Sequence, residues 1–125
     1  MPATQLQHIN IRCIDAEASR NFYVLLGFRQ GPRPPFESMG YWLYSDEEPV
    51  VHLVQKRQGE ARLGPGTGEL NHVAFGGSDL DGMRELLQVK GIAFRETVVP
   101  RDGVTQLFVI DPDGVTLELN FPLGA

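Results

Sequence analysis

The sequence of 125 residues is long enough for one globular domain with a sizeable core, and 42% hydrophobic with 22% charged residues is ordinary for such a domain. The formal net charge of −5 argues against nucleic acid and anionic membrane surfaces as partners. No apolar run approaches the roughly twenty residues of a membrane span, and the N-terminus lacks the basic-then-apolar order of a secretory signal. The lone Cys13 cannot form an internal disulfide, which agrees with a reducing compartment. We therefore expect a cytoplasmic protein, and the net charge names no substrate.

The first half of the sequence predicts a strand, a helix and three further strands. Polar and apolar residues alternate over 6–13, which is typical of a strand. Asp15 can cap a helix that ends at Gly27, where a left-handed C-terminal residue is needed. Three extended runs follow, one from Phe28 and two over 41–44 and 50–55.

The second half repeats this order. A strand is expected over 70–75, and Ser78 or Asp79 can cap a helix that Gly91 closes. The three extended runs that follow cover 92–99, 104–110 and 115–121. Between the halves, the composition over 57–68 turns to Gly, Pro, Arg and Glu, which predicts a surface linker.

The spacing of four polar residues supports an internal repeat. His8 and His72 each precede the glycine that ends the following helix by 19 residues. His52 lies 44 residues after His8, and Glu118 lies 46 residues after His72, so strand parity is kept. Such a repeat predicts an α+β fold of two βαβββ modules related by a pseudo-twofold axis. We expect modules at 5–56 and 69–122 within one domain that spans 1–125.

Residues 105–121 predict a β-hairpin around the turn sequence Asp-Pro-Asp-Gly. In the returning strand, Leu117 and Leu119 bracket Glu118, which places this carboxylate on the opposite face. A solvated outer face would explain such a glutamate, and so would a metal site. The choice depends on which residues share the face.

All three histidines and Glu118 fall at two equivalent positions of the two modules. Taken singly, His8, His52 and His72 are each explained as ordinary strand residues. As a set with Glu118, they form a site for one first-row divalent metal ion. Zinc, iron(II), manganese, nickel and cobalt suit such mixed nitrogen and oxygen ligands, whereas calcium does not. We expect all four side chains within reach of one ion, at about 2.0 to 2.2 Å if it is zinc.

Three further residues are candidates for substrate contacts. Arg12, on the same face as His8, could meet an anionic substrate or be an ordinary surface arginine. Trp42, together with Phe36, could line the mouth of a pocket or pack in the core. Arg101 lies in a short loop before the hairpin that could cover a site.

The motifs resemble those of the vicinal oxygen chelate superfamily over essentially the whole chain. They are His8 and Asp15 with Leu-Gly-Phe at 26–28, then Asn-His-Val-Ala-Phe at 71–75, and Phe-x-x-Asp-Pro-Asp-Gly-x-x-x-Glu-Leu at 108–119. Members include glyoxalase I, fosfomycin-resistance thiol transferases, methylmalonyl-CoA epimerase, extradiol dioxygenases and metal-free bleomycin-binding proteins. The resemblance implies the glyoxalase/bleomycin resistance/dioxygenase fold, with metal ligands at His8, His72 and Glu118. His52 falls on the fourth ligand position, which is usually glutamate in glyoxalase I.

The resemblance implies a metal-dependent lyase or isomerase of the glyoxalase I type that acts on a small oxygen-chelating substrate, such as a thiol adduct. Glu118 would be the catalytic base. Arg12 lies where such enzymes hold a carboxylate of glutathione, whereas Lys56 stands where their asparagine is expected. An extradiol-type dioxygenase, with iron(II) on His8, His72 and Glu118, is the second interpretation. A metal-free binding protein of the bleomycin-resistance kind is the third.

The linker also bears on assembly. It is long enough for the two modules to close on each other or to reach a partner copy. Small single-chain members of the resembled family mostly pair, which implies a homodimer with shared sites. Each site would then combine His8 and His52 of one subunit with His72 and Glu118 of the other.

Overall fold

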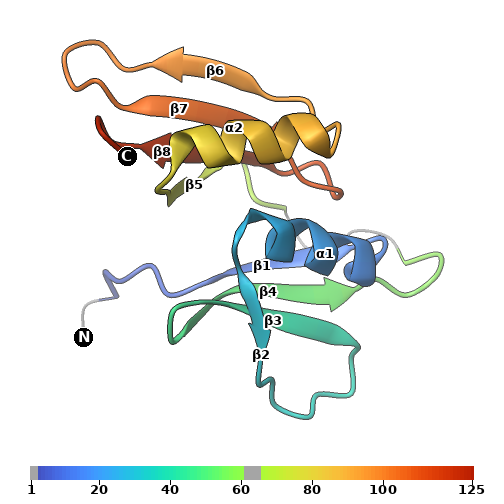
Figure 1. The fold of residues 1–125 in the computed structure, drawn as a ribbon. Coiled ribbons are helices and arrows are strands. Elements are labelled where there is room, and N and C mark those ends of the chain that lie inside the picture. Colours follow the sequence, from blue (N-terminus) through green and yellow to red (C-terminus); the bar gives the residue numbers. More distant parts are fainter. Residues whose placement is uncertain (1–2, 61–65) are drawn as a thin grey trace. The chain divides into compact units, whose positions relative to one another are not determined.

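The computed structural model describes residues 3–60 and 66–125, which form two compact units (Figure 1). The elements of the first unit are β1 (Ile9–Cys13), α1 (Ala16–Leu26), β2 (Arg29–Gly31), β3 (Gly40–Ser45) and β4 (Glu48–Gln55). Those of the second are β5 (Val73–Gly76), α2 (Leu80–Val89), β6 (Arg95–Val98), β7 (Thr105–Ile110) and β8 (Thr116–Phe121). None of the helices in these two ranges is long and apolar enough to cross a membrane. Part of the predicted linker, residues 61–65, lies outside the described residues.

Each unit is one four-stranded sheet with a single helix. The strand orders are β1-β4-β3-β2 and β5-β8-β7-β6, so the two sheets have the same topology. In each, the first and last strands pair in parallel, and the other neighbours pair antiparallel. The helix lies along one face of its own sheet (Figure 1). The predicted α+β fold of two βαβββ modules is confirmed.

The register of the parallel pairs shows how closely the two units correspond. Asn10 of β1 lies opposite His52 of β4, and Ala74 of β5 lies opposite Glu118 of β8. Asn10 stands two residues after His8, and Ala74 stands two residues after His72. The repeat counted along the sequence is therefore also a repeat of strand register.

The first strand of each unit starts three residues later than predicted, at Ile9 and at Val73. In the first unit, Pro49 precedes the part of β4 that pairs with β1, and it has no N–H to donate to that ladder. In the second, β8 begins only one residue before the partner of Val73. His8 and His72 therefore lie immediately before a strand, exposed, and not in its interior.

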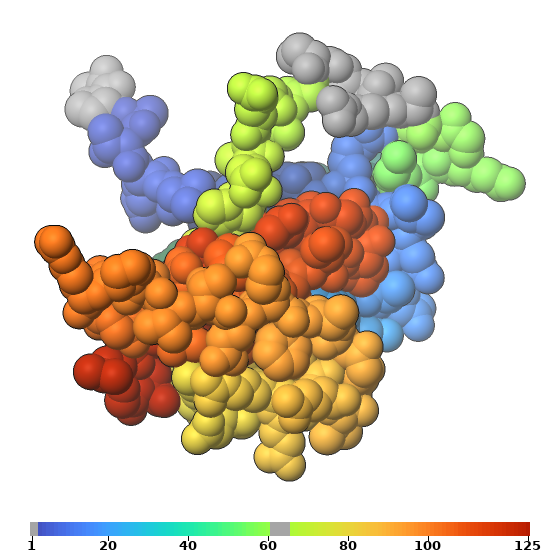
Figure 2. All heavy atoms as spheres, turned by 90° about the horizontal axis from the view of Figure 1, so that it is seen from above, coloured from blue at the N-terminus to red at the C-terminus, as the bar shows by residue number. Residues whose placement is uncertain are grey.

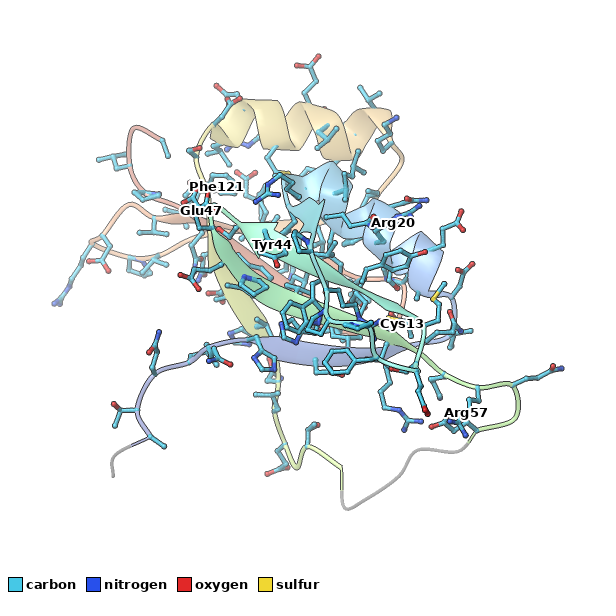
Figure 3. All side chains as sticks on the ribbon, turned by 90° about the horizontal axis from the view of Figure 1, so that it is seen from below. Cys13, Arg20, Tyr44, Glu47, Arg57 and Phe121 are labelled. Atoms are coloured by element: carbon cyan, nitrogen blue, oxygen red, sulfur yellow. The ribbon has the colours of Figure 1, made fainter. Side chains whose placement is uncertain are left out.

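The helix of the first unit has the predicted bounds. The Asp15 carboxylate accepts a hydrogen bond from the backbone N–H of Ala18 at 3.2 Å, and Gly27 has φ of 121° at the C-terminal end. Figure 3 labels Cys13 at the end of β1, where the chain turns into α1. The buried apolar residues of this unit are Ile11, Cys13, Ala16, Tyr23, Leu43, Val51 and Leu53.

The hairpin of the second unit forms as predicted. The Asp111 carboxylate accepts the backbone N–H groups of Asp113 and Val115, each at 2.8 Å, and Gly114 has φ of 87°. This turn sets the register of β7 against β8. Glu118 lies on the face opposite the buried residues of β8, which are Leu117, Leu119 and Phe121, the last of them labelled in Figure 3.

The helix α2 begins at the predicted cap and is tied to the far edge of its sheet. Asp79 accepts the backbone N–H of Gly82 at 3.1 Å. Arg84 donates to both carboxylate oxygens of Glu96 in β6, at 2.8 and 2.7 Å. This paired contact lowers the pKa of the Glu96 carboxyl.

Gly40 of β3 has no room for a side chain, and replacing it should destabilise the first unit. A Cβ there would lie 2.1 Å from the backbone oxygen of Leu53 in the neighbouring strand. We expect Gly40→Ala to lower the free energy of unfolding by about 1 to 3 kcal/mol, the usual effect of overpacking, in urea denaturation. The matched control is Gly76→Ala in β5, where a Cβ meets no atom of the described residues within 4 Å. Equal losses in the two variants would contradict the steric explanation.

Candidate metal centre

The first unit holds two of the predicted ligands in a row of stacked rings. The ring centroids of His8 and His52 lie 3.9 Å apart, and the ring planes differ by 14°. Trp42, the cross-strand neighbour of His52, stacks on the other face of that ring with a centroid distance of 4.1 Å. Phe36 continues the series, 6.3 Å from Trp42. We call Phe36, Trp42, His52 and His8 the aromatic row.

His52 is the most enclosed of the three histidines. It is 8% exposed, and its Nε2 donates to the backbone oxygen of Pro49 at 2.9 Å. Burial lowers the pKa of His52, and the neighbouring His8 and Arg33 lower it further, against a smaller opposing effect of the Pro49 bond. The ring is therefore held in its neutral form, as a metal ligand must be. With the proton on Nε2, its lone pair lies on Nδ1.

The two stacked rings do not point at a common ion in this arrangement. An imidazole nitrogen offers its lone pair in the plane of the ring, and the planes of His8 and His52 run nearly parallel. His52 is packed, whereas His8 is exposed and precedes β1. In Figure 2 residues 3–8, before β1, extend as a single stretch of chain. Convergence on one ion therefore requires a rotation of His8.

The second unit places the other two predicted ligands against each other. Nε2 of His72 lies 3.4 Å from Oε1 of Glu118. The Nδ1 of the same ring lies 2.8 Å from Oδ1 of Asn71, and a carboxamide oxygen can only accept, so Nδ1 carries the proton. The Nε2 lone pair and a carboxylate oxygen thus face each other.

That pair fits a bound cation. The 3.4 Å separation is longer than the charge-assisted hydrogen bond, about 2.7 to 2.9 Å, that a proton between the two atoms would give. Two ligands that each lie about 2.1 Å from a tetrahedral zinc ion are about 3.4 Å apart. One imidazole nitrogen and one carboxylate oxygen are also a donor set that first-row divalent metals accept.

Glu118 is fixed through its second oxygen. Asn120, two residues further along β8 and on the same face, donates its Nδ2 proton to Oε2 of Glu118 at 2.8 Å. The Glu118 side chain is only 13% exposed. Oε2 is therefore occupied, and Oε1 is the oxygen that faces His72.

Each unit thus brings together one pair of the predicted ligands, His8 with His52 and His72 with Glu118. Within either unit, the described residues contain no group of three His, Cys, Asp or Glu side chains that could hold an ion. The single site made of all four side chains stays a prediction.

Arg12 is engaged within its own unit. Its guanidinium forms an ion pair with Glu60, whose other carboxylate oxygen accepts the backbone N–H of Arg57 at 2.7 Å. Figure 3 labels Arg57 in the loop that follows β4. An anionic substrate would have to compete with Glu60 for Arg12. The two residues lie 48 positions apart, so no local sequence pattern predicted their ion pair.

The other two predicted substrate contacts differ in their surroundings. Trp42 stacks directly on a predicted metal ligand, so it belongs to the candidate site as well as to the sheet. Arg101 is exposed and has φ of 75° in the turn between β6 and β7. Its contact with a substrate stays a prediction.

Three carboxamides that lie beside the predicted ligands were not predicted from the sequence. Gln7 and Asn71 each contact the ring of the histidine that follows them, and Asn120 contacts Glu118. A signal for the first two was present: a carboxamide residue directly precedes the first histidine of both modules. Asn120 could be found only from the period of two, which puts it on the face of Glu118.

Comparison with known proteins agrees with this fold. The family model described as "Glyoxalase/Bleomycin resistance protein/Dioxygenase superfamily" matches residues 5–119. A protein named "Glyoxylase I 4" from Arabidopsis thaliana is 31% identical over 127 residues, which cover 93% of this chain and 70% of that protein. The crystal structure of a glyoxalase family protein from Enterococcus faecalis, 28% identical, matches with a TM-score of 0.65 over 94% of this chain and 97% of that one. A glyoxalase/dioxygenase from Nostoc punctiforme, 18% identical, shares the fold with a TM-score of 0.76 over 95% and 91% of the two chains.

Proposed function

This chain belongs to the Glyoxalase/Bleomycin resistance protein/Dioxygenase superfamily, and on that basis we propose that it is a metal-dependent lyase or isomerase of the glyoxalase I type. The observation that carries the proposal is the pairing of His72 Nε2 with Glu118 Oε1 at a separation suited to two ligands of one ion. The similarity to a protein named "Glyoxylase I 4" supports the same class of reaction.

The proposed ligands are His8 and His52 from one unit with His72 and Glu118 from another. Zinc, nickel, iron(II), manganese and cobalt are the candidate ions for three imidazoles and one carboxylate. A bound ion of this kind would polarise two oxygens of a small substrate and stabilise the negative charge that develops on them.

Glu118 is the proposed catalytic base. The Glu118 carboxylate would take a proton from the carbon α to a substrate carbonyl and return it at the neighbouring carbon. Asn120 holds its Oε2, so the carboxylate cannot turn freely away from the substrate. The equivalent position of the first module holds His52 and not a second carboxylate. Glu118 is therefore the one carboxylate base among the proposed ligands.

The ion pair of Arg12 with Glu60 limits which substrates could bind to Arg12. A thiol adduct with a carboxylate could bind Arg12 only by displacing Glu60. A compact substrate that chelates through two oxygens and brings no carboxylate to Arg12 needs no such exchange. Trp42 and Arg101 are proposed to contact it.

We propose a homodimer in which the two pairs of ligands come from different subunits. The proposal rests on the even division of ligands, two in each unit, and on the outer strands of the two sheets, each of which pairs on one side only within residues 3–60 and 66–125. A dimer of this kind has two equivalent sites.

An extradiol-type dioxygenase is the second candidate, and one observation favours it. His52 is enclosed between Trp42 and His8, with Nε2 bonded to Pro49. If His52 keeps these contacts and does not bind the ion, the remaining proposed ligands are His8, His72 and Glu118. Two histidines and one carboxylate are the set typical of non-haem iron(II) oxygenases.

Metal analysis followed by turnover tests separates these functions. We expect protein purified without added metal salts to bind one divalent ion per chain. Such protein should convert the hemithioacetal of methylglyoxal with glutathione, which could reach Arg12 only by displacing Glu60, or a compact chelating substrate that leaves this ion pair intact, and it should leave catechols unchanged. Cleavage of catechols with iron(II) and oxygen would instead establish the dioxygenase. If the protein neither binds added zinc, nickel or iron nor is activated by them, both proposed enzyme functions are contradicted and a metal-free binding protein is favoured.

A further inference from the structure

We infer that Gln7 and Asn71 are equivalent positioning residues, which place the proton of His8 and His72 on Nδ1 and so present Nε2 to a metal ion. The inference also assigns the opposite tautomer to His52. The expected effect of the two carboxamides on metal binding rests on the proposed function, whereas the assignment of the ring protons does not.

The contacts of the two carboxamides are alike. Oε1 of Gln7 lies 2.9 Å from Nδ1 of His8, and Oδ1 of Asn71 lies 2.8 Å from Nδ1 of His72. Because a carboxamide oxygen can only accept, each Nδ1 must donate. The same nitrogen thus carries the proton in both modules, and it donates to a residue at the same place in the repeat.

His52 has the reverse arrangement. Its Nε2 lies 2.9 Å from the backbone oxygen of Pro49, which also can only accept. The proton is therefore on Nε2, and a metal ion could bind only Nδ1. One chain thus contains two histidines of one tautomer and one of the other.

The role of the two carboxamides follows from ring geometry. A histidine that binds metal through one nitrogen usually donates the other N–H to an acceptor, which fixes both the tautomer and the ring orientation. For His72 the arrangement leaves the Nε2 lone pair facing Oε1 of Glu118, as two ligands of one ion require. His8 and His72 are both exposed and lie immediately before their strands, and in each case the carboxamide beside the ring supplies the acceptor for Nδ1.

The tautomers can be observed without any metal. We propose long-range proton–nitrogen correlation spectra of protein labelled with nitrogen-15 in histidine, at about pH 9, well above the ordinary imidazole pKa. Three histidines give three spin systems. We expect two with Nδ1–H and one with Nε2–H. Asn71→Leu should move His72 away from the pure Nδ1–H form, whereas Asn71→Asp, which keeps the acceptor oxygen, should retain it. Nε2–H on His8 and His72 in the wild type would overturn the inference.

Zinc affinity tests the consequence for the metal. We expect Asn71→Leu and Gln7→Leu each to weaken zinc binding by about ten- to hundredfold, measured by competition with a chromogenic chelator. Asn71→Asp and Gln7→Glu should keep wild-type affinity or exceed it. The matched control is Asn21→Leu, the same change on the exposed face of α1.

The outcomes separate this inference from the proposed function. Leucine variants that fold and bind zinc as tightly as the wild type would overturn the positioning role of Gln7 and Asn71. Wild-type protein that shows the expected tautomers but binds no zinc, nickel or iron would support the proton assignment and contradict the metal-dependent function.

Discussion

Glu118→Gln should abolish turnover while leaving much of the metal affinity intact. The substitution removes the base but keeps the size of the side chain, and three imidazole nitrogens remain to hold the ion. General base catalysis contributes about 10² to 10⁴ in rate, so we expect kcat to fall by at least that factor. Metal content and zinc affinity, measured on the same preparation, should fall much less.

The control for this experiment is Glu85→Gln, which makes the same chemical change at an exposed position of α2. It should leave kcat unchanged. Wild-type activity in Glu118→Gln would exclude the base role of that carboxylate. A complete loss of metal together with activity would instead mean that Glu118 serves chiefly as a ligand.

Mixing two inactive variants should restore activity if the sites are shared between subunits. His8→Ala and Glu118→Ala would each destroy both sites of their own dimer. A dimer with one subunit of each kind keeps one site whole, with wild-type His8 and Glu118 together. After random exchange of equal amounts, about a quarter of the wild-type activity should return. Activity assays before and after exchange measure it.

The matched control pairs His8→Ala with His52→Ala. In a shared site these two ligands come from the same subunit, so no combination of the two variants leaves a site whole. No activity should return in this mixture. Native mass spectrometry must show mixed dimers in both experiments. Mixed dimers of His8→Ala and Glu118→Ala without activity would place the whole site within one chain.

Local patterns predicted the elements well, because their causes lie in neighbouring residues. Asp15 and Gly27 have the chemistry that helix ends need, and the structure shows both at the ends of α1. The period of two put Glu118 opposite the buried leucines of β8. The repeat of spacing predicted two equivalent βαβββ modules, and the two sheets have equivalent strand orders.

Contacts between distant residues could not be predicted in this way. The stacking of Trp42 on His52 depends on the register of β3 against β4, which no local pattern specifies. The ion pair of Arg12 with Glu60 depends on the path of the loop after β4. The late start of β1 depends on which residues of β4 can pair with it. Sequence reasoning therefore identified the candidate ligands better than their surroundings.

The placement of the histidines just before β1 and β5 has a thermodynamic consequence. In each unit, one proposed ligand, His52 or Glu118, stands inside a ladder and is already ordered, whereas the other stands at the entrance of a strand. Fixing the backbone of one residue costs about 1 to 2 kcal/mol in conformational entropy. The entropic cost of closing the site therefore falls on His8 and His72. Asn71 already restrains the His72 ring in the arrangement that faces Glu118, which reduces the share of His72 before any ion arrives, whereas His8 must still rotate.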